Sequence, residues 1–141
     1  MSPEILGLLL GIAFVLPTVF VIRRKQWDQI AWPLILLTLP IYYMLFGLLA
    51  GDMQVILLEL LYGIPFILLG VVCWKMGSVW MVYVLAAGWL MHGVYDFTHD
   101  HFFENPGVFT WYPAFCALID VFVAVYLVAA GHNFARPAEL A

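Results

Sequence analysis

Charge is scarce in this sequence of 141 residues, which holds five Lys or Arg and nine Asp or Glu, so that charged residues make up 10% of the chain. Soluble domains carry about 25% charged residues. With so few basic residues there is no basic surface for nucleic acid, and none is expected as a partner. Cysteine is also scarce: Cys73 and Cys116 form no CxxC pair, and the sequence has neither a glycine-rich phosphate loop nor a serine nucleophile elbow.

Apolar residues are abundant instead, at 66% of the chain with a mean hydropathy of +1.04. A soluble domain of this size has too little interior to bury so much apolar surface, whereas a bilayer can solvate it. About 20 apolar residues span a bilayer as a helix, and lipid leaves open strand edges unsatisfied. We therefore expect one all-α domain, a polytopic bundle of five transmembrane helices over residues 3–22, 30–50, 55–74, 77–98 and 111–131.

The positions of the basic residues predict the orientation of this bundle. Arg23, Arg24 and Lys25 follow the first apolar run, Lys75 follows the third and Arg136 follows the fifth, so all five fall on one side of the membrane. The positive-inside rule makes that side cytoplasmic. We therefore expect the N-terminus outside and the C-terminus inside. Because no basic residue precedes the first run, we expect it to be a retained helix and not a cleaved signal peptide.

Ionisable residues within the predicted helices gather at one depth. An ionisable group inside a membrane span is costly and indicates a functional site. At about 1.5 Å rise per residue, all of them lie in the outer half of the membrane, and the inner halves carry no acidic residue or histidine before the boundary. His92, Asp96 and His99 share one face of the predicted fourth helix because they are spaced i, i+4 and i+7. The five residues are Glu59, His92, Asp96, His99 and Asp120.

Imidazole and carboxylate groups in this pattern are typical of a zinc or iron site. We expect His92, Asp96 and His99 to be the metal ligands, with Glu59 and Asp120 supplying a further ligand or a catalytic base. A metal-bound water can reach a pKa near 7 and attack an ester or amide. The pattern therefore predicts a metal-dependent, hydrolase-like membrane enzyme that acts on a lipid or other amphiphile.

Other interpretations of the same residues stay open. His99 can be a hydrated residue at the membrane boundary, and Glu59 and Asp120 can be buried partners that serve helix packing alone. The set can also form a proton relay without a metal. The alternative functions are therefore a metal-ion or proton binding or transport protein, and a non-catalytic accessory subunit of a larger membrane complex. A homo-oligomer is a further possibility that the sequence leaves open.

The strings GWLMHGVYDFTHDHF and WYPAFCALID resemble an uncharacterised family of small five-helix bacterial inner-membrane proteins. This resemblance covers the last three predicted helices and implies a multi-pass protein of the bacterial inner membrane, without implying an activity. The residue types are also similar in chemistry to the seven-helix zinc membrane hydrolases, such as the alkaline ceramidases. The chain departs from those hydrolases in having five predicted helices and in lacking their serine four residues before a histidine.

Overall fold

The computed structural model describes residues 1–134, which form helices and no strand. The all-α, five-helix prediction is confirmed, with helix ends that differ from the predicted ones by a few residues. Short 3₁₀ turns follow the fourth and fifth helices. The elements are α1 (Pro3–Lys25), α2 (Asp28–Leu49), α3 (Met53–Met76), α4 (Val79–Thr98), η1 (His99–His101), α5 (Tyr112–Ala130) and η2 (Gly131–Phe134).

Short polar side chains begin three of the helices. The side chain of Ser2 accepts a hydrogen bond from the N–H of Ile5, that of Asp52 accepts from two N–H groups of α3, and that of Ser78 accepts from the N–H of Met81. These caps satisfy N–H groups that have no partner within their helix. At the other end of α3, Gly77 adopts a φ of 54°, a left-handed conformation that glycine reaches without steric cost.

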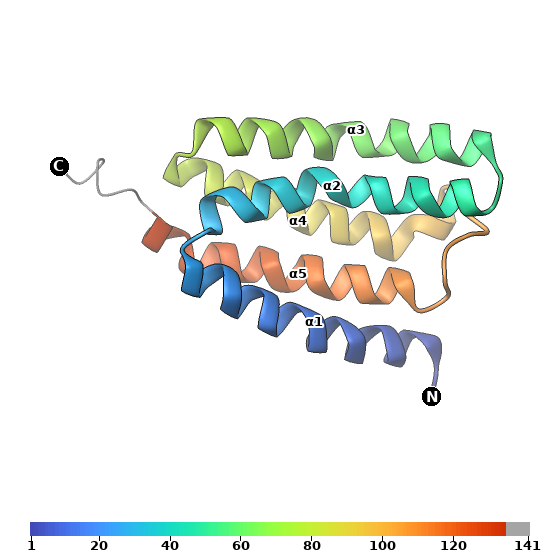
Figure 1. The fold of residues 1–141 in the computed structure, drawn as a ribbon, viewed down its shortest axis with the longest axis horizontal. Helices are drawn as coiled ribbons and strands as arrows, with labels where there is room; N and C mark the ends of the chain where they lie inside the picture. The colour runs from blue at the N-terminus through green and yellow to red at the C-terminus, as the bar shows by residue number, and fades with distance from the viewer. Residues whose placement is uncertain (135–141) are drawn as a thin grey trace.

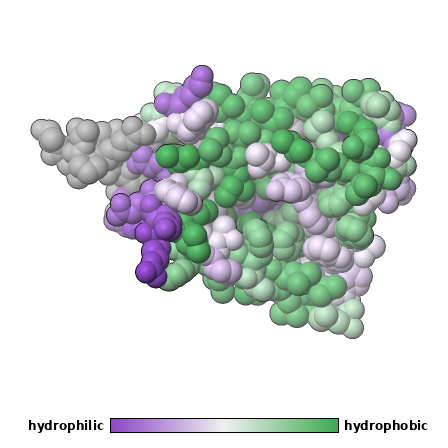
Figure 2. Space-filling model, in the orientation of Figure 1, coloured by the Kyte–Doolittle hydropathy of each residue, from purple (hydrophilic) through white to green (hydrophobic). Residues whose placement is uncertain are grey.

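Four helices are long and apolar enough to cross a membrane, namely α1, α2, α3 and α5. The remaining helix, α4, has 20 residues, which corresponds to about 30 Å of helix and matches the hydrocarbon thickness. It is the less apolar helix because it carries His92 and Asp96 on its buried face. Figure 2 shows a surface that is apolar over most of its area, with strongly hydrophilic residues at the end of the bundle where α1 ends. The chain is therefore a membrane protein by its fold and surface.

The helices pack in pairs around α4. The long contacts are α2 along α3, α4 along α5 and α1 along α5, and α4 also touches α2 and α3 (Figure 1). Glycine permits the close approach of α2 and α3, because a Cβ on Gly63 would lie 2.5 Å from the Cβ of Pro40. Since α4 contacts three other helices, its polar face is enclosed by protein and does not meet lipid.

The end of α1 and the end of α3 lie at the same end of the bundle (Figure 1). The basic residues Arg23, Arg24, Lys25 and Lys75 therefore share one end, as the sequence predicts. Arg136 lies outside the described residues. The side of the membrane that this end faces stays a prediction.

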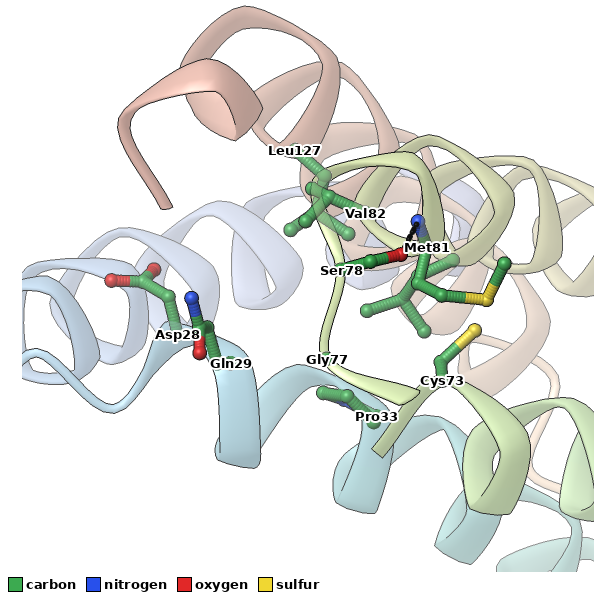
Figure 3. A pocket seen from close by; sticks show the side chains of 10 residues that line it. Asp28, Gln29, Pro33, Cys73, Gly77, Ser78, Met81, Val82 and Leu127 are labelled. Carbon is green, nitrogen blue, oxygen red and sulfur yellow. Dashed lines mark hydrogen bonds between the residues drawn. The ribbon is translucent and has the colours of Figure 1, made fainter. Parts of the chain in front are cut away.

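A polar network lies buried at this basic end. Asp28, the first residue of α2, is 4% exposed and accepts hydrogen bonds from Trp32 Nε1 at 3.0 Å and from the Tyr126 hydroxyl at 2.7 Å. Arg23 lies 3.6 Å from the other Asp28 oxygen. Asp28 also lines a pocket of about 20 Å³ between α2, α3, α4 and α5, shown in Figure 3. A pocket of that size holds about one water.

An apolar core separates this network from the opposite end of the bundle. Trp32 and Trp89 meet edge to face with ring centroids 5.9 Å apart, and both side chains are almost fully buried. Leu36, Val123 and Leu127 complete the centre of the core. The other buried ionisable groups of the helices, namely Glu59, His92, Asp96 and Asp120, lie beyond Trp89, toward the end where α3 and α5 begin.

Candidate metal centre and the adjoining Glu59 network

Two helices bring His92, Asp96 and Asp120 into one buried group. His92 Nδ1 donates to Asp120 Oδ2 at 2.7 Å and lies 3.3 Å from Asp96 Oδ2. Each of the three residues is 1% exposed. One ligand atom from each lies within 4.8 Å of the others, so the group could hold a metal ion. We refer to these three residues as the His92 group.

The local structure explains this placement. His92 and Asp96 are one turn apart on α4 and therefore project from the same face. Gly93 faces α5, where a Cβ would lie 3.0 Å from the Cβ of Asp120 and 3.4 Å from the carbonyl oxygen of Ala117. The missing side chain at Gly93 lets α5 approach closely enough for Asp120 to reach His92.

Unpaired buried polar atoms concentrate around the His92 group. Among the described residues, five buried side-chain atoms lack a hydrogen-bond partner: Tyr43 Oη, Trp89 Nε1, His92 Nε2 and both carboxylate oxygens of Asp96. Trp89, His92 and Asp96 share one face of α4, and the Tyr43 side chain is an electrostatic neighbour of Asp96. Buried polar groups are almost always hydrogen-bonded in native proteins. Several exceptions at one place indicate a ligand site.

The charges of the His92 group also favour a cation. Two buried carboxylates face one imidazole, which compensates one negative charge at most. An uncompensated buried charge is expensive, and coordination of a metal is one of the ways proteins compensate it. A divalent ion with two carboxylates and a neutral imidazole would leave no net charge. Nitrogen and oxygen ligands of these types suit zinc or iron.

A second buried group forms around Glu59 of α3, which is 2% exposed. Glu59 Oε1 accepts from His99 Nε2 at 2.8 Å and from Asn105 Nδ2 at 2.8 Å, and Glu59 Oε2 accepts from the Tyr95 hydroxyl at 2.9 Å. Asn105 Nδ2 also donates to the carbonyl oxygen of Tyr43 at 3.0 Å. This Glu59 network ties α2, α3, α4 and the loop before α5 together.

Asn105 reaches Glu59 because the loop makes a tight turn. The Asn105-Pro106-Gly107 sequence closes with a hydrogen bond from the N–H of Val108 to the Asn105 carbonyl, and the Asn105 side chain accepts from the N–H of Gly107. Any Cβ on Gly107 would collide with the backbone of Phe46. An Asn-Pro-Gly string is typical of a turn, but it does not predict the role of Asn105 in the network. The signal that could have found it is a polar residue at the start of an Asn-Pro-Gly turn, beside a helix that carries buried ionisable groups.

His99 follows α4 in η1 and is 1% exposed. Its ring stacks on Tyr43, with centroids 4.6 Å apart and an interplanar angle of 14°. Burial lowers the pKa of His99. The hydrogen bond and negative charge of Glu59, with a smaller contribution from Asp100, raise it by more than burial lowers it, so the pKa lies above its usual value. His99 is therefore held as a partner of the Glu59 carboxylate.

The structure divides the five predicted site residues between the two groups. His92 and Asp96 meet as predicted, but their third neighbour is Asp120, which the sequence assigns a catalytic role. His99, the third predicted ligand, pairs with Glu59 instead. The predicted roles of these residues as ligands or bases stay predictions.

An acidic pocket of about 420 Å³ lies at the same end of the bundle. It is lined by Glu4, Asp100, Glu104 and Asn105, together with apolar residues of the loop before α5. Asn105 connects the pocket directly to Glu59. The Glu59 network is thus one hydrogen bond away from the aqueous end of the molecule.

No family model matches the chain, and no curated protein or solved structure matches it. The argument for function therefore rests on the geometry of these groups.

Proposed function

We propose that the chain is a metal-dependent, hydrolase-like enzyme of the bacterial inner membrane that acts on a lipid or other amphiphile. The His92 group would bind one zinc or iron ion. The observation that carries this proposal is the Asp96 carboxylate, which is 1% exposed, accepts no hydrogen bond among the described residues and lies beside a second buried carboxylate and an imidazole. A bound divalent cation would supply a partner for one oxygen of this carboxylate and leave the other free.

The proposed reaction is hydrolysis of an ester or amide. A zinc or iron ion held by the His92 group would supply a water of lowered pKa as the nucleophile. In the net reaction the water oxygen would bond to the carbonyl carbon, the bond from that carbon to the alcohol or amine would break, and a proton from the water would pass to the leaving group. We assign the proton transfer to the Asp96 oxygen that does not bind the metal, because both Glu59 oxygens already accept hydrogen bonds. Nothing is oxidised or reduced.

In this proposal the Glu59 network is the support of the site. Tyr95, which donates to Glu59, also contacts the His92 ring with centroids 6.0 Å apart. Glu59 thereby holds α3 against the stretch of α4 that carries His92 and Asp96. We place this end of the bundle on the outer side of the membrane, because the basic residues gather at the other end.

A second candidate function is metal-ion or proton binding without turnover. The acidic pocket and the Asn105–Glu59–His99 connection favour it, since they give ions a route from water to buried ionisable groups. Passage to the basic end would require a route through the core around Trp32, Trp89 and Leu36. That core favours binding over transport across the membrane.

Metal content and hydrolysis in the purified full-length protein test the proposal together. The protein in detergent is loaded with zinc or ferrous iron, desalted and assayed for metal per chain and for fatty acid released from phospholipids and acyl amides. His92→Ala should lose the metal and at least 100-fold of the activity. His101→Ala is the matched control, because His101 is exposed in the adjoining turn.

Three other outcomes would each contradict a different part of the proposal. Stoichiometric metal without hydrolysis would favour the binding protein. If the wild-type protein binds no metal and gives the same results as His92→Ala in both assays, the metal centre is excluded. Stable co-purification with a partner, unaffected by His92→Ala, would favour an accessory subunit.

A further inference from the structure

A groove opens between α1 and α2 on the apolar surface. Since α1 packs along α5 and barely touches α2, the first two helices diverge, and α5 lies between them (Figure 1). The groove has a volume of about 300 Å³. Its walls are mostly apolar and include Phe14 of α1, Leu39 of α2 and Phe115 and Ile119 of α5.

The groove reaches the candidate metal centre. Asp120 is one of its lining residues, and the same carboxylate accepts the hydrogen bond from His92 Nδ1. Cys116, one turn before Asp120 on α5, also lines the groove. An apolar molecule in the groove would therefore lie against the His92 group.

One polar atom at the groove has no hydrogen-bond partner. Trp89 lines the groove and is fully buried, and its indole N–H makes no hydrogen bond. An indole N–H can only donate, so the partner it lacks is an acceptor such as a carbonyl oxygen. The groove thus combines apolar walls with one unpaired hydrogen-bond donor near the His92 group.

The surroundings of the groove identify the occupant. At its rim, Phe14 is 55% exposed and Tyr42 is 49% exposed, on a surface that otherwise faces lipid. If a methylene group takes about the volume of a water, about 30 Å³, the groove holds roughly ten of them. A chain of methylene groups that ends in a carbonyl fits both the walls and the unpaired donor.

We infer that this groove binds one acyl chain of a membrane phospholipid and directs its ester carbonyl toward Trp89 and Asp120. The inference rests on the proposed function only for the reaction at that carbonyl, because lipid binding itself needs no metal. It narrows the substrate class to acyl esters that enter sideways from the bilayer.

Photo-crosslinking tests this inference in the full-length protein. The protein is reconstituted in phosphatidylcholine vesicles that contain a phosphatidylcholine with a diazirine in one acyl chain, and the adducts are mapped by mass spectrometry. We expect wild-type adducts on Phe14, Leu39 and Ile119 at least fivefold above those on Leu45. Leu45 serves as the reference because it is 48% exposed on α2 and lies outside the groove.

Leu39→Trp should fill the groove and reduce the excess of adducts to the level of Leu45, while the metal content stays that of the wild type. Ile119→Phe is the second groove variant if Leu39→Trp does not fold, and Leu45→Trp is the control that keeps the excess. An even distribution of adducts in the wild type, or an excess that survives both groove variants, would overturn the inference. If the wild-type protein binds no metal but keeps the excess of adducts in the groove, the proposed function alone is overturned.

Discussion

Substitution of Glu59 is the strongest test of the Glu59 network. Its carboxylate accepts hydrogen bonds from Tyr95, His99 and Asn105 at 2.8–2.9 Å, and it is 2% exposed. Glu59→Ala removes all three hydrogen bonds at once and leaves the three donors in a buried, water-poor site. Each buried group left without a partner costs about 1–3 kcal/mol, and removal of one member of a buried ion pair costs about 3–5 kcal/mol.

These costs overlap because the three partners share one carboxylate, so we expect Glu59→Ala to lower the free energy of unfolding by about 3–5 kcal/mol. Glu59→Gln keeps the shape and one acceptor oxygen but removes the charge, and a loss of about 1–3 kcal/mol is expected. The measurement is equilibrium unfolding in mixed detergent and SDS micelles, followed by circular dichroism.

Glu104→Ala is the matched control, since Glu104 is an exposed acidic residue of the nearby loop. It should change the free energy of unfolding by less than about 0.5 kcal/mol. If Glu59→Ala is no more destabilising than Glu104→Ala, the three hydrogen bonds do not hold the helices together and the description of this network is wrong.

Three further predictions concern the His99–Glu59 pair, Asp28 and Gly63. Glu59 raises the pKa of His99 despite the burial of the ring. The pair therefore stabilises the fold fully below the His99 pKa of the unfolded chain, about 6.5, and less as the pH rises through the His99 pKa of the folded protein. Between about pH 6 and about pH 9, the thermal midpoint of the wild type should therefore fall by more than that of Glu59→Gln. Asp28→Ala takes an acceptor from an indole N–H and a tyrosine hydroxyl at the basic end and should cost about 2–4 kcal/mol in the same unfolding assay, leaving metal binding intact. Gly63→Ala forces α2 and α3 apart at Pro40 and should cost about 1–3 kcal/mol, and a neutral result would show that the two helices do not meet there.

The sequence alone predicts the helices and the depth of the polar residues. The apolar runs are long enough to identify each span, and the observed helices begin and end within a few residues of those runs. Helix rise then places Glu59, His92 and Asp120 at similar depths, and the structure brings His92 and Asp120 into contact. Depth along a helix is a local property, which explains why it could be predicted.

The pairing of these side chains could not be predicted in the same way. It depends on how each helix is rotated about its axis and on which helix lies in the centre. The closeness of Asp120 to His92 follows from the approach of α5 at Gly93, and the pairing of His99 with Glu59 follows from the packing of α3 and the loop that carries Asn105. These are contacts between distant parts of the chain, and spacing within one helix carries no information about them.

The burial of Asp28 shows the same limit at the other end. By sequence it is a boundary residue beside three basic residues, where exposure to water is the ordinary expectation. Its burial depends on Tyr126, which lies 98 residues away in the chain and donates to it. A hydrogen bond of that separation is a consequence of the fold.

X-ray absorption spectroscopy of zinc-loaded protein tests the central claim most directly, because it reports the atoms bound to the metal. The His92 group predicts one imidazole nitrogen and carboxylate oxygens at about 2.0–2.2 Å, with loss of the nitrogen signal in His92→Ala. Cys116 lies one turn from Asp120, so a Zn–S distance of about 2.3 Å would place the ion on the thiol instead. A sulfur ligand, or a spectrum that His92→Ala leaves unchanged, would contradict the account.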